Sequence, residues 1–182
     1  MLAPVHTDLP ASPFEGLVQN GPRLLLAAMP LVLLQPILGH IAAHVADSRP
    51  ELFARLGVHA SKRFLIDPSD LPFVLVLGPN PARPQLRAYR RSEQPRHDAA
   101  IAGMFLNLLD LIDGSLDGDA QFFSRDLRVS GDVEAVVALR NALDDCEGGA
   151  LDSVVAALGP LSKPAALVVS ALRASRARSR HG

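Results

Sequence analysis

The acidic run from Asp113 to Asp119 is the first segment whose side chains could do chemistry, because its spacing is close to that of a calcium-binding loop. Side-chain oxygens stand at loop positions 1, 3 and 5, and a glycine stands at position 6. A calcium loop also needs a bidentate glutamate at position 12, and that position is Ser124 here. The run therefore predicts a turn, which glycine and aspartate favour, rather than a metal site.

Two histidines, His40 and His44, stand four residues apart and would share one face of a helix, as some metal ligands do. No nearby Cys, Asp or Glu completes a set of three or four ligands. We expect ordinary histidines that are partly buried or lie at an interface, and no bound metal.

Motifs for a nucleophile or a cofactor are absent from the sequence. The single cysteine, Cys146, follows Asp144 and Asp145 and precedes Glu147, and this acidic surrounding disfavours the reactive thiolate. The chain contains no Gly-x-Ser-x-Gly elbow, no Gly-x-x-x-x-Gly-Lys loop and no Gly-x-Gly-x-x-Gly fingerprint. We therefore expect a protein that is not an enzyme and uses no cofactor. A small enzyme with an unrecognised site is the alternative.

The composition limits the class of protein. Apolar residues make up 48% of the chain and tryptophan is absent, so aliphatic side chains must fill any core. The formal net charge of −1 gives no reason to expect nucleic acid as a partner. One cysteine cannot form an internal disulfide, and the N-terminus lacks the pattern of a secretory signal, so we expect a cytoplasmic protein. The apolar excess fits a generous core, an oligomer interface or a cavity for a lipid tail.

The hydrophobic periodicity predicts strands followed by helices. Expected strands cover residues 63–67, 73–77, 85–89 and 97–103, with a fifth around 127–129. Expected helices cover 104–113, 133–144, 151–158 and 164–172, and a capping box at Ser48 opens a short helix that Gly57 ends. The strand at 73–77 is apolar on both faces, so it must lie centrally in its sheet or beside a cavity.

The most apolar stretch runs from Leu24 to Ala46 and contains Pro30 and Pro36. Because proline removes a backbone donor and bends or breaks a helix, we expect broken helices that pack on the domain or lie in a membrane interface rather than a membrane span. The basic C-terminal tail could meet anionic headgroups. The expected membrane contacts are Leu31, Leu33, Leu34, Ile37, Arg176, Arg178 and Arg180.

The stretch from about Ala100 to Asp144 resembles the sterol carrier protein family. That family shows a leucine-rich helix, an acidic break with glycine, an aromatic residue, a short strand, a Gly-Asp pair and a further helix, in this order. The aromatic pair and the Gly-Asp pair look most like those of bacterial accessory factors for ubiquinone biosynthesis within the family. The matching residues are Phe122, Phe123, Arg125, Leu127, Gly131 and Asp132. Glycine would end the strand where a side chain obstructs, and aspartate would cap the helix.

The resemblance implies an α+β fold, with a five-stranded, mainly antiparallel sheet covered by helices and an apolar tunnel. The composition and periodicity indicate a flexible leader at residues 1–16, an apolar helical segment at 17–47 and a basic tail at 173–182, which leaves residues 48–172 for the lipid-binding domain. The proline-rich leader and the arginine-rich end depart from the pattern of the family. The resemblance further implies an isoprenoid quinone precursor or a phospholipid as ligand, and hydroxylating proteins of ubiquinone biosynthesis as partners. A general phospholipid or fatty-acyl carrier on the same fold is the alternative.

The apolar residues at helical spacing after Met104 predict one wall of that tunnel. We expect the lipid to contact Phe105, Leu108, Leu109 and Ile112, together with Phe122 and Phe123.

Overall fold

The computed structural model describes residues 30–113, 127–145, 150–159 and 170. Several expectations lie outside these residues: the leader, the calcium-like run after Asp113, Phe122, Phe123, Cys146 and the basic tail. The helix expected at 164–172 also lies outside them, apart from Ser170.

Five strands form one sheet in the order β3-β2-β1-β4-β5. β1 pairs in parallel with β4, and the other three pairs are antiparallel, so the expected mainly antiparallel sheet is confirmed. Each strand lies within two residues of its predicted position. The strands are β1 (Phe64–Pro68), β2 (Phe73–Gly78), β3 (Gln85–Arg90), β4 (Ala99–Gly103) and β5 (Leu127–Gly131).

β4 begins at Ala99 rather than at the expected His97, because Asp98 forms hydrogen bonds to Arg63 ahead of the strand. The carboxylate oxygen Oδ2 of Asp98 accepts a bond from the backbone N–H of Arg63 at 2.7 Å. The backbone N–H of Asp98 donates to the carbonyl oxygen of Arg63 at 2.9 Å, so Asp98 ties the start of β4 to the start of β1.

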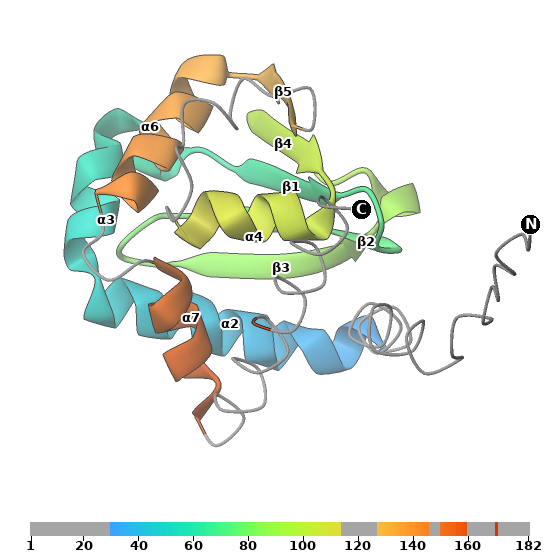
Figure 1. Ribbon diagram of the computed structural model, residues 1–182, viewed down its shortest axis with the longest axis horizontal. Helices are drawn as coiled ribbons and strands as arrows, with labels where there is room; N and C mark the ends of the chain where they lie inside the picture. Colours follow the sequence, from blue (N-terminus) through green and yellow to red (C-terminus); the bar gives the residue numbers. More distant parts are fainter. Residues whose placement is uncertain (1–29, 114–126, 146–149, 160–169, 171–182) are drawn as a thin grey trace, which may run out of the picture.

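The helices cover one face of the sheet, and Figure 1 shows α4 crossing in front of the strands. They are α2 (Leu31–Ser48), α3 (Pro50–Leu56), α4 (Phe105–Asp113), α6 (Val133–Asp144) and α7 (Ala150–Ala157). Two short 3-10 turns, η1 (Gly57–Ser61) and η2 (Arg91–Glu93), complete the described elements. The main core lies between the helices and the sheet, where Phe64, Leu56 and Val136 are almost fully buried.

α2 differs from the sequence prediction, because the helix continues through Pro36 instead of breaking there. Pro36 has no N–H, so the carbonyl oxygen of Val32 loses the hydrogen bond that it would accept within the helix. Val32 lies in the exposed first turn, where water can donate that bond instead. The predicted break at Pro30 is where the helix starts. By length and composition, α2 is long and apolar enough to cross a membrane.

α2 nevertheless packs within the domain, along edge strand β3 and beside α7 (Figure 1). The side-chain amide of Gln35 donates to the carbonyl oxygen of Ala88 in β3 at 2.6 Å. Leu34 is buried against Leu71 and Phe73. An uncovered edge strand presents unpaired backbone groups, and α2 shields this one.

The predicted capping box at Ser48 is not formed. Ser48 is the last residue of α2, and its hydroxyl donates to the carbonyl oxygen of His44 at 2.7 Å. Arg49 stands at the N-cap of α3 without a side-chain cap bond, and Pro50 fills the first turn. Gly57 does end α3, with a positive φ of 51°, as predicted.

Candidate functional site

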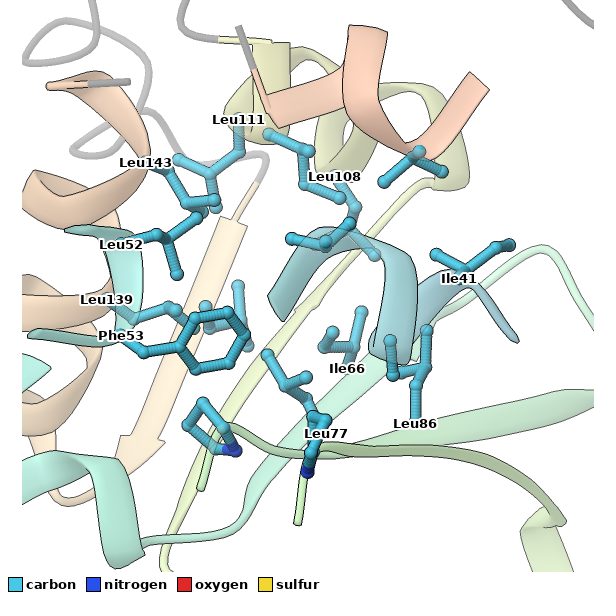
Figure 2. Close-up of a pocket in the computed structure, with 17 residues that line it drawn as sticks. Ile41, Leu52, Phe53, Ile66, Leu77, Leu86, Leu108, Leu111, Leu139 and Leu143 are labelled. Atoms are coloured by element: carbon cyan, nitrogen blue, oxygen red, sulfur yellow. The ribbon is translucent and has the colours of Figure 1, made fainter. Parts of the chain in front are cut away.

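An apolar cavity of about 140 Å³ lies between the sheet and its covering helices. Figure 2 shows the side chains that surround it, which converge from the helices above and from the strands below. The lining residues are Ile41, Ala42, Val45, Leu52, Phe53, Ile66, Leu77, Pro79, Pro84, Leu86, Ile101, Leu108, Leu111, Ile112, Leu139, Leu143 and Val154. None of these described residues carries a charged or hydrogen-bonding side chain, so the part of the wall that they form suits hydrocarbon.

The strand walls follow from alternation along the β2–β3 hairpin. In β2 and β3, Leu77 pairs with Leu86, and both side chains turn toward the cavity. Their neighbours Val76 and Arg87 pair on the opposite face of the sheet. The strand predicted at 73–77 therefore lies beside a cavity, as expected, but only one of its two apolar faces meets it.

The helix walls come from residues one helical turn apart. Leu108, Leu111 and Ile112 of α4 line the cavity at the i, i+3, i+4 spacing of one helix face. From α2, Ile41 and Val45 reach it at the same spacing. The sequence prediction missed α2 as a wall, although its apolar period contained this signal.

The volume limits what the cavity holds in this conformation. An engineered cavity of about 150 Å³ accommodates one benzene molecule. A polyprenyl or acyl chain is several times larger, so a bound tail requires the surrounding helices to move apart. α2 supplies one wall and one hydrogen bond to β3, and it is the covering helix with the most exposed apolar outer face among the described residues.

The expected lipid contacts are partly brought together. Leu108 and Ile112 line the cavity, whereas Leu109 of the same helix does not. Phe105 packs against a second apolar cluster formed by Leu34, Leu71, Phe73 and Ala88. Phe122 and Phe123 lie outside the described residues. As a lipid-binding set, these residues remain a prediction.

The expected membrane contacts on α2 lie on two faces of the helix. Leu33 is 58% exposed and Ile37 is 37% exposed, whereas Leu34 is buried at 6% and Leu31 is half-buried against the second cluster. Val32, which was not predicted, is 79% exposed. Arg176, Arg178 and Arg180 lie outside the described residues.

The Gly-Asp pair that carries the family resemblance has the geometry expected from sequence. Gly131 ends β5 with φ of 75°, and Asp132 caps α6 by accepting a bond from the backbone N–H of Ala135 at 3.0 Å. The other carboxylate oxygen of Asp132 accepts a bond from the ammonium of Lys62. The bond to Lys62, then the bond from Ala135, lowers the pKa of Asp132, and the same bond to Asp132 raises the pKa of Lys62.

Catalytic and metal-binding groups do not gather at the cavity. Within the part of the chain that the structure describes, no three His, Cys, Asp or Glu side chains are close enough to hold a metal ion. His40 and His44 share one face of α2, with their ring centroids 6.3 Å apart. Neither histidine lines the cavity.

Comparison with known proteins gives one family match. The family model for the SCP-2 sterol transfer family matches residues 40–144. No curated protein matches the chain.

Solved structures with a similar fold include a UbiJ-SCP2 ubiquinone synthesis protein, at 20% sequence identity and TM-score 0.41, with 74% of this chain and 94% of that chain covered. Sterol carrier protein 2 from Yarrowia lipolytica, in its apo form, aligns at 14% identity and TM-score 0.42, over 58% of this chain and 85% of that chain. The sterol carrier protein domain 2 of Helicoverpa armigera aligns at 14% identity and TM-score 0.39, over 62% and 87%.

Proposed function

This chain belongs to the SCP-2 sterol transfer family, and on that premise we propose that it is a non-catalytic lipid carrier that holds the hydrocarbon tail of a lipid in its apolar cavity. The observation that carries the proposal is the cavity wall, because every described residue that lines it has an apolar side chain. Burial of a hydrocarbon chain there is favourable by about 0.8 kcal/mol for each CH₂ group.

The proposed lipid is a polyprenylated precursor of ubiquinone, presented to hydroxylating enzymes of an oxygen-independent pathway. Support comes from the sequence around Phe122-Phe123 and Gly131-Asp132, which resembles the bacterial accessory factor UbiT. A polyprenyl tail is wholly apolar, as the cavity wall is.

The proposed location is the cytoplasm, with peripheral contact to a membrane. Exposed apolar side chains cluster on the outer face of α2, where Val32 and Leu33 are largely exposed and Ile37 is partly exposed. The inner face of the same helix lines the cavity through Ile41 and Val45. Insertion of the outer face into a membrane would act on one of the helices that line the cavity, and a displacement of this helix would help a lipid to enter.

The absence of a chemical group from the cavity wall favours a carrier over an enzyme. A general acid or base must come within hydrogen-bond reach of the reacting atom. No titratable side chain is among the described residues that line the cavity, so a tail held against them meets no such group.

A general phospholipid or fatty-acyl carrier is the second candidate. The same wall favours it, because a site without polar groups selects a tail and does not discriminate between headgroups.

The quinone role is tested by the quinone content of cells that lack the gene and grow without oxygen. We expect ubiquinone to fall and the prenylated precursor to accumulate, and the wild-type gene to restore both. Normal ubiquinone in the deletion strain would reject the quinone role and leave the general carrier.

A further inference from the structure

A small basic hollow of about 190 Å³ lies on the face of the β2–β3 hairpin that is turned away from the apolar cavity. Three arginines, Arg63, Arg83 and Arg87, surround it. Its floor is formed by Val76 and by Gly78, whose missing side chain leaves the space open. The hollow is separate from the apolar cavity, and a role for it is additional to the proposed function.

The three arginines are set in place by ordered backbone. Arg63 is fixed by its backbone bonds to Asp98, and Arg87 pairs with Val76 inside the sheet. Arg83 ends a tight turn in which its own N–H donates to the carbonyl of Asn80 at 3.0 Å. The Oδ1 atom of Asn80 accepts a bond from the N–H of Ala82, also at 3.0 Å, and stiffens this turn.

The positive charge in the hollow is only partly compensated: Lys62 pairs with Asp132, and the carboxylate of Asp98 accepts a bond from the backbone N–H of Arg63. No carboxylate is among the lining residues, and the side chains of Arg63, Arg83 and Arg87 are exposed and make no ion pair within the described part of the chain. Neutral side chains that can donate hydrogen bonds, Gln85 and Tyr89 among them, complete the wall.

Three arginines beside neutral hydrogen-bond donors suit a phosphate group as ligand better than they suit a carboxylate group. A guanidinium presents paired N–H donors whose fork matches the oxygens of phosphate, and several arginines together suit a dianion. The hollow is large enough for one or two phosphate groups and too small for a folded partner.

The position of the hollow links it to the tip of the hairpin. Pro79 and Pro84 line the apolar cavity, while their neighbours Asn80 and Arg83 line the hollow. The two sites therefore meet at one turn, with hydrocarbon walls on one side and guanidinium groups on the other.

We propose that Arg63, Arg83 and Arg87 form a binding site for a phosphate group, carried by a soluble phosphate ester or by the headgroup of a phospholipid. The site needs no movement of the helices, because its arginines are already exposed at the sheet face.

The test uses the full chain and two probes. Inorganic pyrophosphate is titrated by calorimetry, and co-sedimentation is measured with phosphatidylcholine vesicles that contain or lack phosphatidic acid. Arg87→Gln removes one guanidinium from the hollow. Arg90→Gln is the matched control, because Arg90 is exposed on the same strand and does not line the hollow.

We expect Arg87→Gln to weaken binding about tenfold, the loss that one charge-assisted hydrogen bond predicts, and Arg90→Gln to leave it unchanged. If Arg87→Gln alone weakens the binding of pyrophosphate, the site is assigned to a soluble phosphate ester. If Arg87→Gln alone weakens the binding of vesicles and pyrophosphate does not bind, the site is assigned to a lipid headgroup. The proposal is overturned if neither probe binds the wild type, or if both variants weaken binding equally. Thermal melting checks that each variant is folded.

Discussion

The carbonyl oxygen of Asp98 lies 2.4 Å from the point at which a Cβ atom on Gly131 would sit. The N–H of Asp132 donates to the same carbonyl oxygen at 2.9 Å, so β4 and β5 are joined where β5 gives way to α6. Gly131 also has φ of 75°, a region that side-chain-bearing residues rarely adopt. The Gly-Asp pair is thus needed for the close approach of the β4 and β5 backbones as well as for the N-cap of α6.

Gly131→Ala should lower the free energy of unfolding by at least about 1–3 kcal/mol, because the new methyl group meets backbone rather than a side chain that can move. Urea denaturation measures the change.

Gly39→Ala is the matched control, since nothing lies within 4 Å of a Cβ atom there and Gly39 is inside α2. It should raise stability by about 0.5–1 kcal/mol. Equal effects of the two substitutions would contradict the close approach at Asp98.

Asp132→Asn keeps a capping oxygen for Ala135 and removes the charge that pairs with Lys62. Because the pKa of Asp132 is lowered on folding, its stabilising contribution is present above its ordinary value of 3.8 and is lost as the pH falls through the folded value. The raised pKa of Lys62 means that the contribution is lost again as the pH rises above 10.5.

Wild type should therefore exceed Asp132→Asn in stability at neutral pH, and the difference should vanish in strong acid and shrink in strong alkali. Thermal melting of both proteins across the pH range tests this. A difference that does not change with pH would show that the pair with Lys62 does not contribute.

Replacement of Val32, Leu33 and Ile37 by serine should abolish flotation with liposomes and leave the fold intact, because these side chains are exposed on α2. Val58→Ser is the control, since Val58 is 81% exposed in η1, away from α2. Deletion of residues 1–47 is a poorer test, because Leu34 and Ile41 belong to the interior and their loss should cause aggregation. Undiminished flotation of the triple variant would place the membrane contact elsewhere.

Replacement of Arg176, Arg178 and Arg180 by serine should erase a preference for anionic over zwitterionic vesicles. Each arginine near an anionic surface contributes roughly 1 kcal/mol, and screening shortens its reach to about 8 Å at physiological salt and about 3 Å at 1 M. Co-sedimentation at low and high salt measures this. Wild-type binding that ignores both salt and lipid charge would show that the tail is only a solvated segment.

The strands were predictable because their alternation and turn residues are local. The helix α6 was predicted at its observed bounds, Val133–Asp144, since Asp132 is a strong cap next to a periodic run. The continuity of α2 through Pro36 was not predictable, because it depends on tertiary packing against β3.

The cavity wall was predictable only in part, because it depends on how helices rotate against the sheet. Leu108 and Leu109 are adjacent in the chain, yet a step of one residue turns the helix by about a quarter of a circle, and only Leu108 meets the cavity. Local periodicity identifies the apolar face of α4. It does not show which side of that face meets the cavity and which side packs against neighbouring elements.

The most direct test of lipid carriage is mass spectrometry of organic extracts from the purified wild type, Ile112→Asp and Leu109→Asp. Ile112 lines the cavity and Leu109 does not, although both are half-buried in α4. A carboxylate in an apolar wall is costly, so folded Ile112→Asp should lose its lipid while Leu109→Asp keeps it. We predict a polyprenylated quinone precursor in the wild-type extract. A folded wild-type protein that yields no lipid, or an Ile112→Asp variant that retains as much lipid as wild type, would contradict carriage in this cavity.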